Sequence, residues 1–510
     1  MICLLIGGIS VAVISRAENQ GLQIAACRAM NPWDPPENCG KVDVSDDGDG
    51  DDGDGDDGDI DVPENDPFQP AKCLLAEDQT KDTYVVQILF IKMSGSDQLK
   101  IQQWSDGTVT LERVTETKGG VTASISAGIP GLKDWGGSAS LSGSYMKGSG
   151  SGGQWLFNGN KSDDPQADLE ANLEDAKQFA EFLKAAEKCN KTTGPRASEL
   201  GMICGYHANK KKPDIDPEKA PDVDITKTTT EVSGAVGLSK GFKKTDGKDL
   251  GSVSTEGISG AMANEVVVMR TKTGPDAGKV TFIYSFNMSG TVGQAAQAKG
   301  SRMQQVAVTY DAAAYDQEEK DGKDHHPEKV VITTSQESGD GVGVSVGAGA
   351  NAGPVTIDVG GGGGNVESEI HTESAEVVLD NDEDSTAVED WLRGRGDSPA
   401  NGSLPSPTSA AEALDDDATP IERLLHDKGK LTRLDYKANT DWWNASMGIG
   451  FGVSAGQFTL GFKLFGIDIT HEEKSQKITG NPTYATGPQS GGTRPWVPFT
   501  NCTRTTPIDT

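Results

Sequence analysis

The sequence predicts a mainly β protein in which long antiparallel hairpins form a sandwich or barrel-like sheet, with one amphipathic helix inserted and a membrane helix at the N-terminus. Three observations support this fold class. Small and branched residues alternate with a period of two over four long segments, and this period places successive side chains on opposite faces of a strand. Glycine accounts for 64 of 510 residues, while apolar residues make up only 35%. An apolar run opens the chain.

The opening run extends from Ile2 to Ile14. It is shorter than the roughly 18 to 20 residues that cross a bilayer, and no basic residue precedes it as in a signal peptide. We interpret it as the back half of a longer membrane segment that starts upstream, with a short buried helix as the alternative. Helical spacing continues afterwards, so residues 1–30 are expected to form a membrane-associated helix. Ile24 to Cys27 superficially match a lipoprotein cleavage box, but polar residues separate them from the apolar run.

The acidic run from Asp46 to Asp66 indicates a linker, which we place at residues 31–72. The core of the run contains only Asp and Gly, so it has nothing to bury and repels itself. An EF-hand calcium loop needs Gly at position six and Glu at position twelve. Counted from Asp47, these positions hold Asp and Gly, so only weak, diffuse cation binding is expected.

Six of the seven cysteines lie outside the opening run, and no pair has the spacing of a zinc site. An even, widely spaced set is typical of disulfides in an oxidising compartment. Short loops favour two local pairs, Cys27 with Cys39 and Cys189 with Cys204, and leave one pair to join the two ends, although fifteen pairings are possible. The disulfide candidates are Cys27, Cys39, Cys73, Cys189, Cys204 and Cys502.

The first 90 residues share a set of features with known exported proteins. An apolar helix is followed by Ala25 to Ala29 (AACRA), an Asn31-Pro32 turn to Cys39, the acidic linker, and Pro70 to Cys73 (PAKC). In this order they resemble actinobacterial exported proteins of unknown function, with a Flp/Tad pilin-like N-terminal membrane helix and a large extracellular β-rich region. The resemblance implies export and anchoring, with the protein on the extracellular side of the cell membrane, in the cell envelope or secreted. It implies no activity.

The first strands are expected directly after this region. Tyr84 to Met93 is predicted as one apolar strand. Leu99 to Gln103 and Thr108 to Val114 flank Ser105-Asp106-Gly107, and Asp-Gly between two alternating runs is the strongest local signal of a hairpin.

Four longer hairpins share a Thr- and charge-rich outer end and a middle of small residues. In the third, Val342, Val344 and Val346 alternate with glycine and serine, and its two arms are near mirror images about residues 351–354. Repeated glycine in a strand costs stability, so we expect a close neighbour on that face, either a packed sandwich or a small barrel. The predicted arms are 115–129 with 138–145; 228–242 with 253–268, followed by a turn at 274–278 into 280–288; 330–349 with 355–379; and 447–453 with 458–464.

Helices are expected at three places. Asp164 and Pro165 begin an amphipathic helix that ends near Cys189. Shorter helices begin at Ser385 and at Thr419, where Thr-Pro-Ile-Glu forms a capping box. The domain prediction is therefore a β-rich ectodomain at 73–393 with a helical insert at about 164–190, a flexible linker at 394–418, a short helix and the last hairpin of the same sheet at 419–480, and an extended tail at 481–510.

Chemical motifs are sparse. The six histidines lack metal-ligand spacing, His325-His326 lies in a charged loop, and no serine-hydrolase elbow occurs. Gly274 to Thr281 imitates a phosphate loop with the wrong spacing and is interpreted as a turn, and Arg395-Gly396-Asp397 is a tripeptide that arises easily by chance. The sequence therefore predicts no catalytic, cofactor-binding or metal site and no cofactor. A net charge of −31 argues against nucleic acid as a partner.

Two functions remain. The first is an exported, membrane-tethered surface or envelope protein with a non-enzymatic structural or partner-binding role. Its partners would be the membrane, through the N-terminal segment, and an envelope or surface protein. The second is a pore-forming protein that inserts the Gly/Ser-rich amphipathic hairpin at 330–379 into membranes. The central stretch of each arm has one apolar and one Gly/Ser face, and its length matches the roughly 9 to 11 residues of a membrane barrel strand.

Overall fold

A computed structural model describes residues 66–508, apart from 89–90, 124–142, 160–163, 191–218, 234–237, 244–248, 256–260, 293–297, 353–354, 393–404, 456–457 and 491. The chain divides into two units, Met1–Asp61 and Val62–Thr510, and the description below concerns the second. The predicted N-terminal helix, most of the acidic linker, Cys27, Cys39, Cys204 and the Arg395-Gly396-Asp397 tripeptide lie outside the described residues.

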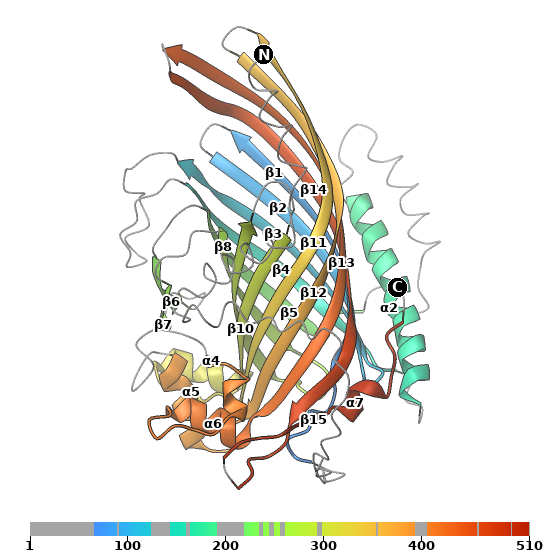
Figure 1. The fold of residues 1–510 in the computed structure, drawn as a ribbon, viewed down its shortest axis with the longest axis vertical. Coiled ribbons are helices and arrows are strands. Elements are labelled where there is room, and N and C mark those ends of the chain that lie inside the picture. The colour runs from blue at the N-terminus through green and yellow to red at the C-terminus, as the bar shows by residue number, and fades with distance from the viewer. Residues whose placement is uncertain are drawn as a thin grey trace, which may run out of the picture. The chain divides into compact units, whose positions relative to one another are not determined.

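The second unit contains a closed antiparallel β-barrel (Figure 1). Among the described residues, twelve strands pair in sequence, and the sheet closes because β14 pairs with β1 from Ala76↔Lys477 to Ile88↔Phe465. The mainly β prediction is confirmed, and the barrel rather than the sandwich is the architecture. The strands are β1 Leu74–Ile88, β2 Ile91–Trp104, β3 Val109–Ala123, β4 Gly143–Phe157, β5 Val223–Ser233, β8 Ala261–Thr271, β9 Lys279–Val292, β10 Ala298–Asp311, β11 Lys329–Ala352, β12 Val355–Val378, β13 Lys430–Ala455 and β14 Phe458–Ala485.

The barrel has two different ends. One, which we call the cap end, carries the β2–β3 turn and the helices α2 (Pro165–Asn190), α4 (Ala312–Asp321), α5 (Asp382–Leu392) and α6 (Pro420–Lys428). The other, which we call the tip end, carries the β1–β2, β11–β12 and β13–β14 turns. The β11–β14 strands extend further at the tip end than β1 and β2 do (Figure 1), because β1 ends where Ile88 pairs with Phe465.

The predicted third and fourth hairpins are confirmed in register. Ala352 pairs with Val355 at the top of β11–β12, and Ala455 pairs with Phe458 at the top of β13–β14. The Asp-Gly turn between β2 and β3 is also confirmed, because Gly107 adopts a positive φ of 81°. A Cβ atom there would lie 2.9 Å from the Pro165 carbonyl oxygen, so a side chain would strain the backbone and collide with the start of α2.

Two strand predictions were wrong in detail. Tyr84 to Met93 is not one strand, because β1 ends at Ile88, β2 begins at Ile91 and these two residues pair. The second long hairpin is branched: β5 pairs directly with β8, while β6 (Leu238–Lys243) and β7 (Asp249–Thr255) form a separate two-stranded sheet between them. The run 84–93 contains none of the usual turn residues, so it does not reveal where the chain reverses.

The helices cover the outside of the cap end. The helix predicted from Asp164 is confirmed as α2, and Thr419 forms the expected capping box with Glu422 before α6. The α5 helix begins at Asp382, three residues before the predicted start, and α4, which was not predicted, is capped by Asp311. Within the described part of the chain, no helix is both long and apolar enough to cross a membrane.

These helices build two apolar cores against the outer face of the barrel. Against α2, Phe179 packs edge-on to Trp155 of β4, with the ring centroids 5.3 Å apart. Against α4, Tyr315 packs on Phe282 of β9 with the ring centroids 5.0 Å apart, and α5 and α6 extend the same core with Val388 and Leu425. Burial of this kind contributes about 1.5 to 3 kcal/mol per large side chain.

The tail and the second linker differ from the predictions. Within 394–418, expected to be a flexible linker, Ser409–Ala411 forms a 3-10 turn with Ala410 and Ala411 buried in the core. The tail at 481–510, expected to be extended, contains β15 (Trp496–Pro498) and α7 (Thr500–Thr503). Arg494 anchors it, because its buried guanidinium donates hydrogen bonds to backbone carbonyls that include those of Leu425, Gly429 and Thr486.

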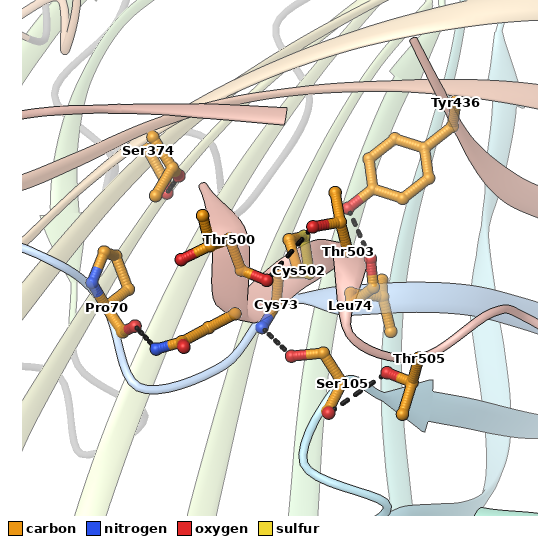
Figure 2. The surroundings of a disulfide bond; sticks show 12 residues. Pro70, Cys73, Leu74, Ser105, Ser374, Tyr436, Thr500, Cys502, Thr503 and Thr505 are labelled. Carbon is orange, nitrogen blue, oxygen red and sulfur yellow. Dashed lines mark hydrogen bonds between the residues drawn. A yellow bond between two sulfur atoms is a disulfide. The ribbon is translucent and has the colours of Figure 1, made fainter. Parts of the chain in front are cut away.

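The disulfide between Cys73 and Cys502 joins the start of β1 to this tail, as the sequence favoured (Figure 2). Its surroundings are hydrogen-bonded: the Cys73 amide donates to Ser105 Oγ, the Thr505 hydroxyl donates to the Ser105 carbonyl, and the Tyr436 hydroxyl donates to the Leu74 carbonyl. The segments that lead into β1 and out of β14 are therefore covalently joined at the cap end.

Candidate functional site

The register assigns every barrel residue to one of two faces, because directly paired residues point to the same side of a sheet. Ile101 of β2, Leu111 of β3 and Trp155 of β4 pair in one row and contact α2, so their face is the outside of the barrel. Lys100 and Glu112 pair in the neighbouring row, so they line the lumen.

A contact across the lumen supports this assignment. Lys474 Nζ on β14 lies 3.1 Å from Glu337 Oε1 on β11, although β12 and β13 separate the two strands in the sheet. Ser368 of β12 donates a second hydrogen bond to the same Glu337 oxygen, at 2.7 Å. Side chains reach over intervening strands in this way only on the concave side of a curved sheet.

A second group of luminal charges lies over β4. Lys227 Nζ on β5 lies 2.5 Å from Glu265 Oε2 on β8 and 3.7 Å from Glu116 Oε2 on β3, and Lys118 Nζ lies 3.6 Å from the same Glu116 oxygen. The Glu116 side chain is only 4% exposed and that of Lys227 12% exposed. In contrast, the Lys272–Asp224 pair on the outer face is about half exposed on both sides.

Glycines on β4 make room for these side chains. A Cβ atom on Gly148 would lie 2.6 Å from both Glu116 Oε1 and Lys118 Cγ, and one on Gly150 would lie 3.2 Å from Glu116 Cβ. The inner surface of β4 is therefore flat, and the neighbouring charged side chains lie across it. Thr229 of β5, which pairs with Gly148, is buried beside them.

Beyond the helical cap, the outer face has a polar band. Its side chains form ion pairs between neighbouring strands, including Arg113 with Asp97 at 3.2 Å. Two histidines occupy equivalent settings: His371 Nδ1 lies 2.7 Å from Asp435, and His471 Nδ1 lies 2.7 Å from Asp82. Burial lowers the pKa of His371, but its hydrogen bonds to Asp435 and Glu373 outweigh burial and raise the pKa above its usual value.

Nearer the tip end, the outer face becomes apolar without any covering element among the described residues. One row of the register runs Val359, Met447, Ile467, Val86 and Met93 across five strands. Met93 is 57% exposed, Val359 53% and Met447 42%. We call this row, together with the next row toward the cap, the outer belt.

The next row contains Ala445, Ile469 and Tyr84, and the aromatic ring of Tyr84 lies over Gly95, where a Cβ atom would be 2.4 Å from the ring. Trp443 marks the boundary with the polar band. It is half exposed, and it stacks on His471 with the ring centroids 5.6 Å apart. The outer belt is thus apolar, exposed and bordered by aromatic side chains.

The residues that sequence reasoning singled out have other roles. His325 is buried, stacks on Tyr315 and lies 3.1 Å from Glu319, so it belongs to the α4 core. Gly274 and Gly278 both adopt positive φ in the hydrogen-bonded turn between β8 and β9, as predicted. No group of metal-binding side chains occurs in the described part of the chain.

Sequence reasoning did not identify the outer belt or the luminal charges. Tyr84 and Met93 were placed in one strand, which hid that they lie on the outer face of two paired strands. The sequence analysis singled out none of the luminal lysines and glutamates. The available signal was a change along single strands, from polar outward positions such as Asn439 to apolar ones such as Met447.

No known protein family matches the sequence, and no curated protein is similar to it. Among solved structures, OccAB2 of Acinetobacter baumannii aligns with 79% of this chain and 98% of its own, at 7% identity and a TM-score of 0.13. OccK7 (OpdD) of Pseudomonas aeruginosa aligns with 80% of this chain and 99% of its own, at 7% identity and a TM-score of 0.12. Scores this low carry no functional argument, so the class rests on the geometry above: a closed antiparallel β-barrel with a helical cap at one end.

Proposed function

We propose that the chain is a channel-forming β-barrel that crosses a membrane with its tip end, while the helical cap remains in water. The observation that carries this proposal is the outer belt, in which exposed apolar side chains from five neighbouring strands lie side by side on the outer face of a closed sheet. Monomeric soluble proteins rarely expose contiguous apolar surface of this kind.

The belt matches the requirements of a bilayer in three ways. A closed barrel pairs its backbone groups internally, which is the condition for a β structure in hydrocarbon. Trp443 and Tyr84 lie at the belt edge, where aromatic side chains favour the interface. The strand β13 continues from Trp443 to Ala455, enough for the roughly 9 to 11 residues of a membrane strand.

The inner face supports a channel rather than a solid anchor. Opposite the belt residues of β12 and β13, the inward positions in the sequence are Gly360, Gly362, Asn444 and Ser446. Small and polar residues on the inside with apolar residues on the outside are typical of membrane barrels with an aqueous lumen. The sequence-based hypothesis had only the hairpin at 330–379 enter the membrane, whereas the present proposal has the tips of all the barrel hairpins enter it.

The expected setting follows the N-terminal resemblance. We propose that the protein is exported and non-enzymatic, and acts in the cell envelope or at the outer surface. The N-terminal segment would tether the chain to the membrane, and the belt would supply the second attachment.

Vesicle experiments test the proposal on the full chain. The wild type is expected to float with lipid vesicles and to release a small entrapped dye. Met447→Glu should abolish release, because a carboxylate facing lipid costs about 1 to 2 kcal/mol or more. Asn439→Glu is the matched control, since it lies on the same face of the same strand within the polar band, and it should release dye like the wild type.

Wild-type protein that leaves vesicles intact would overturn the channel. If the wild type also failed to float, the exposed belt would instead be a docking surface for an envelope protein, which is the first of the two functions that the sequence left open. Circular dichroism in detergent shows whether Met447→Glu retains the β signal of the wild type.

A further inference from the structure

We infer that four luminal side chains, Glu116, Lys118, Lys227 and Glu265, form the constriction that sorts small inorganic ions by charge in this channel. The inference rests on the proposed function and names the site that would set its selectivity. Two independent features of the lumen support it: the crowding of these charges over β4, and two buried oxygen atoms that need a ligand.

The crowding arises from the glycines of β4. Gly148 and Gly150 remove the side chains that would otherwise separate β3 from β5, so Lys118 and Lys227 approach Glu116 from either side, at 3.6 and 3.7 Å. Lys227 continues the chain of charges to Glu265 on β8. The result is a row of alternating charges across four strands, β3, β4, β5 and β8, on the inside of the barrel.

The burial of these charges indicates that the lumen is narrow here. The side chains of Lys118 and Lys227 are both less than one-sixth exposed, although they lie on the inner face of the barrel wall. An ion passing this level must come within a few ångströms of them, where interactions between charges are strongest. Rings of charged side chains at a constriction commonly determine which ions a channel passes.

Two oxygen atoms at this level point to a permeant ligand. Among the described residues, neither Glu116 Oε1 nor Thr229 Oγ1 has a hydrogen-bond partner, although both atoms are buried. Buried polar atoms are nearly always satisfied, so water or an ion is needed at both positions. The two atoms flank the same glycine, because Glu116 lies over Gly148 and Thr229 pairs with it.

Removing the luminal negative charges and removing the luminal positive charges should have opposite effects on ion selectivity. Glu116→Gln or Glu265→Gln leaves the lysines in excess and should favour chloride. Lys118→Met or Lys227→Met leaves the carboxylates in excess and should favour potassium. Each change is expected to alter the potassium-to-chloride permeability ratio by about fivefold, which corresponds to about 1 kcal/mol. The double variant Glu116→Gln/Lys227→Met removes one charge of each sign and should return the ratio toward the wild-type value.

Reversal potentials of the full chain in planar bilayers, measured across a potassium chloride gradient, test the inference. Lys272→Met and Asp224→Asn are the controls, because they remove the same types of charge from a pair on the outer face. Opposite shifts for the two luminal signs, with unchanged controls, would support the constriction. If the wild type conducts and the luminal variants behave like the controls, this inference is wrong and the channel stands. A wild type that passes no current overturns both.

Discussion

The outer face of β13 differs sharply between its two ends. At the cap end, Leu431 is fully buried in the core that α6 and the neighbouring strands form. At the tip end, Met447, on the same strand and the same face, is 42% exposed. Both ends are apolar in sequence, and among the described residues only the cap end has a protein element over it. The difference teaches that apolar residues on one face of one strand can serve two ends, a packed core at the cap end and the exposed surface that the proposed function assigns to a membrane at the tip end.

The largest expected effect is on the free energy of unfolding, which should respond to a substitution at the cap end but not at the tip end. Leu431→Ala should lower the free energy of unfolding in detergent-free buffer by about 2 to 5 kcal/mol, because it leaves a cavity in a packed core. Met447→Ala should change it by less than about 0.5 kcal/mol, since the side chain has few protein neighbours to lose. Urea unfolding followed by tryptophan fluorescence measures both. Equal losses for the two variants would show that the belt is already covered by protein.

The disulfide is expected to have the next largest effect. Cys73→Ser/Cys502→Ser should lower the free energy of unfolding by about 2 to 4 kcal/mol, because the bridge restricts the unfolded chain over nearly the whole barrel. The loss should appear with the wild type under reducing conditions as well. A double variant as stable as the oxidised wild type would show that the hydrogen bonds of Ser105, which joins Cys73 to Thr505, hold the two ends together without the disulfide.

Substitutions in the outer belt are expected to affect the binding of the protein to vesicles. Met447→Ala and Met93→Ala should each weaken vesicle binding by about 0.5 to 1.5 kcal/mol, because part of each side chain would otherwise leave water. Asn439→Ala, an exposed position on the outer face of β13 within the polar band, is the control. Flotation at graded lipid concentrations gives the affinities. Binding that falls equally in the control would contradict a belt of limited height.

The smallest effect concerns the polar band and its dependence on pH. The raised pKa of His371 means that protonation favours the folded state, so its contribution is present below the ordinary histidine pKa and is lost as the pH rises through the raised value. His371 is nearly half exposed, so solvent limits the effect to less than about 1 kcal/mol. His371→Gln should therefore reduce stability at pH 5 but not at pH 8.5, as measured by urea unfolding. A loss that is the same at both values would assign His371 a packing role.

Local patterns predicted much of the fold. Alternation placed β11 to β14 with their hairpin registers, and capping residues placed α2 and α6. The turn between Ile88 and Ile91 was missed because the surrounding run, Gln87 to Lys92, contains none of the usual turn residues. The α4 helix was missed because it is short and follows a strand directly.

Closure and the candidate site required long-range information. The pairing of β1 with β14, from Ala76↔Lys477 to Ile88↔Phe465, joins the two ends of the barrel sequence, which no local pattern encodes. The contact of Lys227 with Glu116 depends on the registers of β3, β4 and β5 together. It also depends on the glycines of β4, which make room for these side chains, and this cannot be recognised without the neighbouring strands. The alternation that predicted the hairpins is equally compatible with a soluble sheet, so the sequence left both functions open.

The even number of barrel strands has a consequence for sidedness. β1 starts and β14 finishes at the cap end, where Cys73 is bonded to Cys502, so in a membrane-spanning barrel of the kind proposed the two flanking segments would emerge in one compartment. Only hairpin loops would reach the far leaflet. Epitope tags fused before Cys73 and after Thr510 should therefore become accessible to antibody from the same side in intact cells, whichever way the barrel faces.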